Sequence, residues 1–397
     1  MKSPTSLARP PLALSAASFV SSFDRFAVSP MLVLIAVDLK VPLSAAVAAA
    51  SGYYLAYGLT QPLWGLLSDR FGRVRVMRGT LFGAALAGLA SALMPVLGAL
   101  VVARIVTGAC FGAVIPTGLT YVGDTVEPST RQRALTDLMG AAALGTALAT
   151  GLSGVLAGLV DWRVAFTVPA ACALACALAL RSLPEPSRSL PHGRGFGVGR
   201  YLGAVLGHGW ALLVFGLAFV EGAIMLGAMP FLATALEHAG YAAAVAGLAI
   251  TAYGLGLWLF TKLVRRLSGR WPTPALMTVG GAQLCAGFAI VAVHVDMATV
   301  AVTALLLGGG WSFLHSSLQT WATSVVPEAR GTTIAFFACA LFVGSAVASW
   351  AAGPLAEHGR YALLFGLAAA AAIPLTAAAA LTRRRYGTLH GELPRTG

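Results

Sequence analysis

Long apolar segments recur from one end of the chain to the other, separated by short stretches rich in charged residues, proline and glycine. Each segment is about 20 residues long, which is the length that an α-helix needs to cross a hydrocarbon core about 30 Å thick. The pattern therefore predicts twelve membrane-spanning helices. Their expected ranges are residues 11–37, 45–67, 77–96, 98–122, 137–160, 164–183, 206–232, 241–264, 273–294, 297–322, 332–355 and 361–381.

The composition excludes most other classes of protein. Of the 397 residues, 58% are hydrophobic and only 10% are charged, and the mean hydropathy is +0.82. Soluble globular proteins carry about 25% charged and 45–50% apolar residues. We therefore expect an all-α polytopic membrane protein. All five cysteines fall inside apolar segments, so the sequence predicts no disulfide framework and no metal site, and it indicates no cofactor.

The basic residues are distributed unevenly between the two sides of the predicted membrane. Of the 26 lysines and arginines, 21 fall at the termini and in alternate loops on one side, whereas the other side has only Lys40, Arg163 and Arg360. Because lysine and arginine accumulate in cytoplasmic loops, we predict a multi-pass protein of the cell membrane, such as a bacterial inner membrane, with both termini in the cytoplasm. Topology and anionic lipid headgroups thus explain the net charge of +12, and no nucleic-acid partner is expected.

An internal repeat divides the chain into two halves. The polar stretch at residues 184–205 is predicted to be a cytoplasmic linker between residues 1–183 and 206–397. Ala56–Leu59 recurs as Ala252–Leu255, an offset of 196 residues. Repeated halves of six helices are typical of transporters whose substrate site lies between the halves and whose access alternates by rocking. Four further identities recur at an offset of 199 residues, namely Arg131, Gly145, Gly154 and Phe166 as Arg330, Gly344, Gly353 and Phe365.

Several short motifs resemble those of the major facilitator superfamily. The stretch from Gly65 to Arg73 matches the loop signature G-x-L-x-D-R-x-G-R at every defined position, and Arg104–Gly108 is similar to the R-x-x-x-G of span four. Pro327–Gly331 resembles P-E-x-R-G, and Trp162–Phe166 resembles W-R-x-x-F. The resemblance implies the major facilitator fold, with two pseudo-symmetric six-helix bundles, and points to its group of drug or metabolite:proton antiporters. The matching residues of the loop signature are Gly65, Asp69, Arg70, Gly72 and Arg73.

In this family the signature loop acts as a cytoplasmic gate. The resemblance implies that Asp69 faces the start of span eleven, where Arg330 and Gly331 stand and where free N–H groups favour an anion. The second half departs from the pattern, because Arg265 occupies the position equivalent to Asp69. We expect Arg265 to pair with Asp137, an acid in the first turn of span five, when the cytoplasmic side closes.

Four ionisable side chains fall inside predicted spans: Asp24, Arg25, Arg104 and Glu221. Charges within a bilayer are costly and are functional candidates by default. Asp24 and Glu221 lie 197 residues apart, at nearly equivalent positions of the repeat, and the family resemblance places both on cavity-lining helices. We expect each of the two acids to face the other half across one cavity. Glu221 has no basic neighbour in its own span, which makes it the first choice for a proton-carrying group. For Asp24, Arg25 and Arg104, the alternative to a functional role is a buried structural network of ion pairs.

Polar and aromatic side chains mark a candidate substrate cavity. In span ten, Trp311, His315 and Gln319 are spaced by four residues and so share one helix face, and Tyr57 and Gln61 form a smaller stripe in span two. His315 has two interpretations, a packing element with a hydrogen bond or a proton relay. A cavity with aromatic rings and few charges favours a lipophilic or weakly polar organic compound.

The leading hypothesis is proton-coupled efflux of such a small molecule by an antiporter, which we expect to be a monomer in the lipid bilayer. The alternative is uptake of a small metabolite by proton symport. Exporters of this superfamily often have a proline in span five at the position where this chain has Thr150, so the resemblance leaves the direction open. A membrane enzyme or non-transporting sensor is a remote alternative, because the sequence contains no catalytic cluster and no soluble signalling domain.

Overall fold

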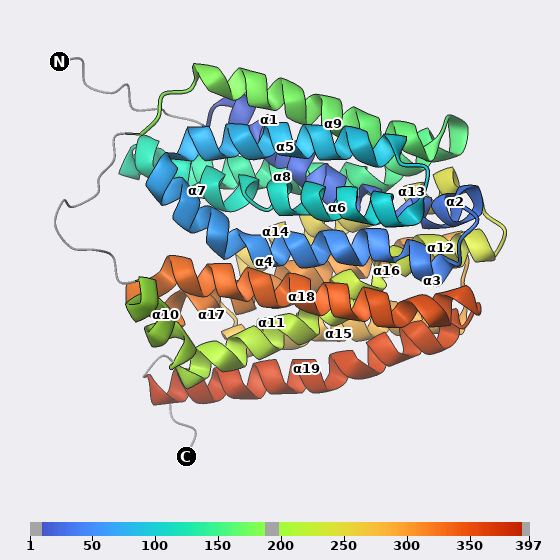
Figure 1. Ribbon diagram of the computed structural model, residues 1–397. Helices are drawn as coiled ribbons and strands as arrows, with labels where there is room; N and C mark the ends of the chain where they lie inside the picture. The colour runs from blue at the N-terminus through green and yellow to red at the C-terminus, as the bar shows by residue number, and fades with distance from the viewer. Residues whose placement is uncertain (1–9, 187–197, 391–397) are drawn as a thin grey trace.

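The computed structural model describes residues 10–186 and 198–390. Within these residues the chain forms helices and no strands, and the long helices run side by side in one elongated bundle (Figure 1). The chain is therefore an all-helical, multi-pass membrane protein, as the apolar pattern predicts. The first half contains α1 (Leu12–Ala27), η1 (Ser29–Met31), α2 (Leu32–Asp38), α3 (Leu43–Ala46), α4 (Ala48–Phe71), α5 (Arg73–Leu93), α6 (Leu97–Phe111), α7 (Val114–Thr125), α8 (Pro128–Leu159), α9 (Trp162–Ala179) and η2 (Leu180–Ser182).

The second half repeats this order of elements, in which some spans are one continuous helix and others consist of two consecutive helices. In the span formed by α16 and α17, a turn of π-helix, η3, lies between the two helices, directly after a run of three glycines. The elements are α10 (Val198–Leu206), α11 (Gly209–Ala228), α12 (Pro230–His238), α13 (Ala243–Ile250), α14 (Ala252–Leu267), α15 (Thr273–Val293), α16 (Met297–Gly310), η3 (Trp311–His315), α17 (Ser316–Val325), η4 (Pro327–Ala329), α18 (Arg330–Glu357) and α19 (Tyr361–Leu389).

Eleven helical segments of the described chain are long and apolar enough to cross a membrane, one fewer than the twelve that the sequence predicts. The difference lies at α4, which covers the predicted span 45–67. This helix is 24 residues long, but it contains three tyrosines, Gln61, Asp69 and Arg70, which lower its hydropathy. It lies beside α18 in the bundle (Figure 1) and packs between α6 and α18. Its tyrosines and Gln61 are buried in the bundle, while Asp69 and Arg70 are exposed at its end, so α4 is a helix of the bundle without being uniformly apolar.

Several helices extend beyond the predicted apolar limits. Helix α8 begins at Pro128, nine residues before the predicted start at residue 137, and α19 continues to Leu389. Backbone hydrogen bonding continues where the side chains become polar, so a helix does not have to end at the edge of the apolar segment. Part of the predicted linker is also helical, as α10, while residues 187–197 of that linker lie outside the described residues.

The sequence repeat is visible as repeated helix crossings. A Cβ atom added at Gly145 of α8 would lie 2.2 Å from the backbone oxygen of Phe19 in α1. The equivalent position in the second half is Gly344 of α18, whose added Cβ would lie 2.0 Å from the backbone oxygen of Phe219 in α11. Only glycine permits this approach of two backbones, and small residues serve the same purpose in other membrane helices. The two halves therefore use the same glycine contact at the same crossing.

The repeated glycines of the Ala-Tyr-Gly-Leu segments join the two halves to each other. An added Cβ at Gly58 of α4 would lie 2.7 Å from Cβ of Phe342 in α18, and one at Gly254 of α14 would lie 2.1 Å from Cβ of Ala147 in α8. Each contact connects a helix of one half with a helix of the other. The repeat at an offset of 196 residues thus marks the interface between the halves.

The contacts between the halves are distributed unevenly along the bundle. We call the end that carries α10 and the end of α9 the linker end, at the left of Figure 1, and the other the closed end. At the closed end, Ser44 of α3 donates a hydrogen bond to Glu357 of α18, and Gly154 of α8 lies against Ala243 of α13. At the linker end, the space beside Gly65 and Gly331 is open. The halves are packed together at the middle and at the closed end.

Candidate functional site

A buried ion pair joins α1 to α6 inside the first half. Nη2 of Arg104 lies 2.9 Å from Oδ2 of Asp24, and Nη1 lies 3.2 Å from Oδ1, so both carboxylate oxygens accept hydrogen bonds. The two side chains are fully buried, with exposures of 0% and 1%. The guanidinium also lies 4.6 Å from the ring centroids of Tyr53 and Phe166. The structure thus brings Asp24 and Arg104 together, in the bidentate geometry that compensates two buried charges best.

Arg25 is not a member of this ion pair, and the prediction of a three-residue network is wrong in that respect. Its guanidinium lies 5.2 Å from the ring centroid of Tyr57 and 5.4 Å from that of Phe342, and Nη1 donates a hydrogen bond of 3.3 Å to the hydroxyl of Tyr57. Consecutive residues of a helix point in directions about 100° apart, so Asp24 and Arg25 cannot face the same neighbour. Because Phe342 belongs to α18, Arg25 lies at the interface of the two halves.

A second buried pair lies inside the other half. Nδ1 of His315 lies 3.1 Å from Oε2 of Glu221, and both side chains are buried. His315 is held by Trp311, whose ring stacks on the imidazole at 3.7 Å within the turn of π-helix. Such turns are frequent at functional sites. The second carboxylate oxygen of Glu221, Oε1, is buried and has no hydrogen-bond partner.

The two acids do not face each other across one cavity. Asp24 turns toward Arg104 in its own half, and Glu221 turns toward His315 in its own half. The two acids therefore belong to two separate buried pairs, one in each half.

The other predicted cavity residues lie in different surroundings. Tyr57 and Gln61 are buried on α4, and Trp311 is half-buried beside His315. Gln319 is exposed on α17, although its spacing of four residues predicts that it shares a face with His315. Within residues 10–186 and 198–390, no three His, Cys, Asp or Glu side chains are close enough to hold a metal ion.

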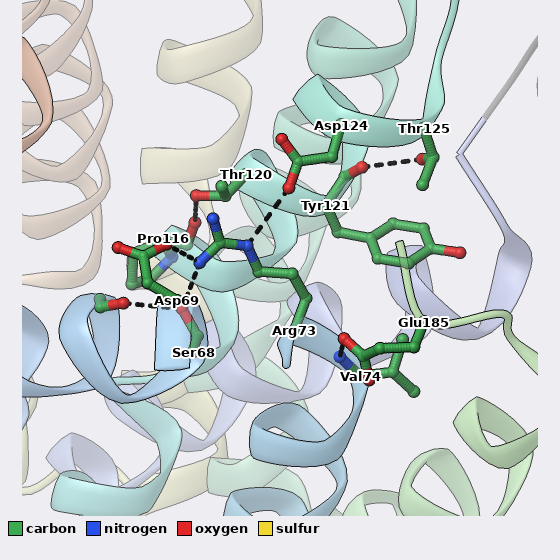
Figure 2. Close-up of polar contacts among 11 residues, drawn as sticks. Ser68, Asp69, Arg73, Val74, Pro116, Thr120, Tyr121, Asp124, Thr125 and Glu185 are labelled. Atoms are coloured by element: carbon green, nitrogen blue, oxygen red, sulfur yellow. Dashed lines mark hydrogen bonds and ion pairs between the residues drawn. The ribbon is translucent and has the colours of Figure 1, made fainter. Parts of the chain in front are cut away.

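The signature loop forms a compact polar cluster at the linker end (Figure 2). Helix α4 ends at Phe71, and Gly72 reverses the chain with a φ of +108°, a conformation that glycine adopts without strain. Arg73 then forms an ion pair with Asp69, lies 3.3 Å from Asp124 of α7 through its Nε, and donates a hydrogen bond of 2.9 Å to the hydroxyl of Ser68. The arginine therefore ties α4, α5 and α7 together.

Glu185 joins this cluster from the segment that follows α9 (Figure 2). Its carboxylate accepts hydrogen bonds of 3.1 Å from the backbone N–H groups of Val74 and Arg75. These are free donors at the first turn of α5, where a negative charge is favoured by the helix dipole. Neither Glu185 nor Asp124 is among the residues predicted from the sequence. An acid between two prolines at the start of the predicted linker is the signal that was available for Glu185.

The predicted contacts between the halves are not formed at this end. Asp69 pairs with Arg73 of its own loop, while Gly331, in the first turn of α18 after Arg330, has open space beside it. Arg265 and Asp137 are both exposed, and no ion pair joins them in the described chain. Asp137 is also not in the first turn of its helix, because α8 begins nine residues earlier. Arg70, the remaining charge of the motif, lies over the ring of Phe71 at 5.4 Å.

Comparison with known proteins gives three kinds of similarity. The family model described as Major Facilitator Superfamily matches residues 14–349. A triacylglyceride transporter of Mycolicibacterium smegmatis is 31% identical over 140 residues, which are 34% of this chain and 25% of that protein. The crystal structure of the nucleoside transporter NupG has a TM-score of 0.75 at 14% identity and covers 94% of this chain and 99% of its own.

The crystal structure of a D-xylose-proton symporter is also similar, with a TM-score of 0.72 at 17% identity, covering 90% of this chain and 95% of its own. At these identities the solved structures share the fold with this chain. The match to the mycobacterial relative spans only a quarter of that protein's length.

Proposed function

Because the chain belongs to the major facilitator superfamily, it is a membrane transporter, and we propose that it exports a small organic compound in exchange for protons. The observation that carries this proposal is the buried pair of Glu221 and His315. It is a pair of titratable groups held inside a membrane helix bundle, with one carboxylate oxygen left without a hydrogen-bond partner. Intramembrane acids and histidines of this kind form proton relays in pumps and transporters.

Glu221 is better suited than Asp24 to carry the proton. Both oxygens of Asp24 accept hydrogen bonds from Arg104, whose charge is permanent, so protonating Asp24 would leave a buried cation without a partner. With a neutral imidazole at His315, the pair has one negative charge, on Glu221, and one incoming proton makes the pair neutral. The pair can therefore bind and release one proton, and neither of its two states contains an unpaired buried cation.

A carrier must also expose its substrate site to each side of the membrane in turn, by alternating access. The halves are packed together at the closed end, where Ser44 of α3 donates a hydrogen bond to Glu357 of α18, whereas a Cβ atom added at Gly65 or Gly331 of the linker end would meet no atom within 4 Å. We assign the linker end to the cytoplasm, because 21 of the 26 basic residues are predicted on that side. In this assignment an exporter would take up its substrate from the cytoplasm when the linker end is open.

The variant Glu221→Gln tests the role of the acid, because the amide keeps the shape of the side chain and cannot titrate. We expect it to abolish transport driven by a pH gradient in proteoliposomes, and to leave substrate counterflow, which needs no gradient, within about twofold of wild type. Glu237→Gln, which changes another carboxyl group of the same span, serves as the matched control. Gradient-driven transport at the wild-type rate in Glu221→Gln would overturn the role of Glu221.

The direction of coupling is tested with the same vesicles. A screen of toxic organic compounds in a strain without its own exporters supplies the transported compound. In an antiporter, an outward flow of that compound drives protons inward, whereas a symporter moves both in one direction. A pH-sensitive dye inside the vesicles therefore separates export by exchange from uptake of a metabolite.

Transport of a lipid is a second candidate, favoured by one feature of the surface. A groove of about 320 Å³ opens between α4, α5 and α6, lined mostly by apolar side chains that include Trp64, Leu67 and Phe71. The relative from M. smegmatis is named a triacylglyceride transporter. Transfer of a fluorescent triacylglycerol across proteoliposome membranes tests this candidate, and a rate equal to that of protein-free vesicles would exclude it.

A further inference from the structure

Arg25 is the one charged side chain of the predicted intramembrane set that has no ionic partner in the described structure. Its neighbours are aromatic rings, with Phe26 at 5.0 Å, Tyr57 at 5.2 Å and Phe342 at 5.4 Å from the guanidinium carbon. The hydrogen bond from Nη1 to the Tyr57 hydroxyl satisfies one donor. Nε is buried and has no hydrogen-bond partner among the described residues. The side chain is half-buried, and the rings and the Tyr57 hydroxyl stabilise its positive charge without neutralising it.

The nearby acids cannot supply the missing negative charge. Asp24 is neutralised by Arg104 through two hydrogen bonds, and Glu221 is paired with His315 in the other half. The aromatic rings attract the faces of the planar guanidinium, but the N–H donors lie in its plane and point along its edges. An edge of this kind binds a carboxylate through two parallel hydrogen bonds. Arg25 therefore has free N–H donors and a positive charge that no acid neutralises, which suits it to bind an anion.

Further donors without partners occur close to Arg25 in the sequence and among its neighbours. Within the described chain, the hydroxyls of Ser22 and Ser29 are buried without hydrogen-bond partners, Ser22 three residues before Arg25 in α1 and Ser29 four residues after it, at the start of η1. The hydroxyl of Tyr54 is also buried and unpartnered, and its ring lies 6.4 Å from that of Phe342, the ring that Arg25 contacts as well. Buried polar groups are normally satisfied, so a cluster of free donors indicates an acceptor that arrives with a ligand.

We propose that Arg25 binds the anionic group of the transported compound, and that the substrate is an organic monoanion with an apolar body. One free guanidinium matches one negative charge, and the rings of Tyr57 and Phe342, 4.7 Å apart, provide the apolar wall. Because Arg25 and Tyr57 belong to the first half and Phe342 to the second, the bound compound contacts both halves. This inference rests on the proposed function as a carrier and defines the class of its substrate. A water-soluble aromatic acid and a membrane-derived fatty acid share the required chemistry.

The test compares each acid with its neutral amide. The full-length protein in phosphatidylcholine nanodiscs is titrated with 4-phenylbutyrate or 4-phenylbutyramide, and with decanoate or decanamide, and the Kd is measured by tryptophan fluorescence. For at least one pair we expect wild type to bind the acid at least tenfold more tightly than the amide. Arg25→Gln should remove that difference, and the exposed Arg270→Gln should preserve it. The pair with the larger preference distinguishes the aromatic source from the fatty-acid source.

A second variant separates loss of binding from loss of folding. Arg25→Lys keeps the positive charge and loses the planar fork, so we expect it to retain the melting temperature of wild type and a preference for the acid that is reduced severalfold. The inference is overturned if wild type binds acids and amides equally in both pairs, or if Arg25→Gln or Arg25→Lys keeps the full preference.

Failure of this inference can be distinguished from failure of the proposed proton coupling, because ligand binding to the protein in nanodiscs involves no proton gradient. Proton-coupled transport of a neutral compound that is unaffected by Arg25→Gln would overturn this inference and leave the carrier function standing. A preference for the acid that depends on Arg25, in a protein that moves no protons, would support the anion site and overturn the coupling.

Discussion

At the residue scale, the two halves hold equivalent acids in different chemical settings. Asp24 has a permanently charged partner, Arg104, whereas Glu221 has a titratable partner, His315. In the first pair both carboxylate oxygens accept hydrogen bonds from Arg104, whose Nε has no partner among the described residues, and in the second pair one carboxylate oxygen has no partner there. Sequence symmetry alone would assign one role to both acids. Their partners instead favour a structural role for the first and a proton-carrying role for the second.

The structural role of the first pair predicts a specific pattern of stability. Asp24→Leu should lower the free energy of unfolding by about 3–5 kcal/mol, because it strands the buried charge of Arg104. The double variant Asp24→Leu with Arg104→Met replaces both charges by apolar groups and should recover most of that loss. Thermal unfolding in detergent measures the difference. A double variant less stable than either single variant would contradict the assignment.

At the scale of elements, the start of α5 is stabilised by a residue from another span. Glu185 supplies the negative charge that the first turn of α5 lacks, since this turn contains no acidic residue of its own. Arg73 connects the same helix start to Asp69 and Asp124. The signature loop is therefore attached through Glu185 to the start of the linker. A movement of α5 would be transmitted through this contact to the segment that joins the halves.

Removing this cap should loosen the first turn of α5 while the bundle stays intact. Glu185→Ala leaves the N–H groups of Val74 and Arg75 without an acceptor, and a lost cap costs about 1 kcal/mol. We expect hydrogen exchange at these amides to accelerate roughly fivefold, since 1.4 kcal/mol corresponds to tenfold in an equilibrium constant. Mass spectrometry of peptides covering residues 72–80 measures this, with Glu237→Ala as control. Unchanged exchange in Glu185→Ala would show that the contact stabilises nothing.

At the scale of the whole molecule, the fold implies a second state in which the linker end closes. The closed end shows what such closure requires, namely helix ends from opposite halves in contact, as α3 is with α18. At the linker end the corresponding candidates are α4 with α18 and α14 with α8. Asp69 and Gly331 belong to the first pair of helices, and Arg265 and Asp137 belong to the second.

We predict an ion pair between Arg265 and Asp137 in the state with a closed linker end. Both side chains are exposed here, so the pair should contribute about 1 kcal/mol or less, enough to shift a balanced equilibrium between two states. Each charge reversal alone, Arg265→Asp or Asp137→Arg, should lower the transport rate, and the double reversal should restore part of it. If the double variant transports no faster than the slower single variant, the two residues do not pair.

The sequence by itself determined the properties that depend on composition along the chain. Apolar segments identified all eleven helices of the described chain that are apolar enough to span a membrane on their own, and the same pattern located α4, which is less apolar and packs between α6 and α18. The repeat identified the glycines at which helices cross, because a close approach of backbones requires a small residue at a fixed position, as at Gly58 and Gly254. The presence of a charged residue inside an apolar segment was enough to identify Asp24, Arg104 and Glu221 as candidate functional residues.

Only the tertiary structure decided which of these side chains meet. Glu221 and His315 are 94 residues apart and Asp24 and Arg104 are 80 residues apart, so their pairing depends on how helices cross and rotate against one another. Spacing along the chain does not encode that rotation. For the same reason Arg25, adjacent to Asp24 in sequence, lies at the interface between the halves, because one step along a helix turns a side chain by about 100° toward a different neighbour.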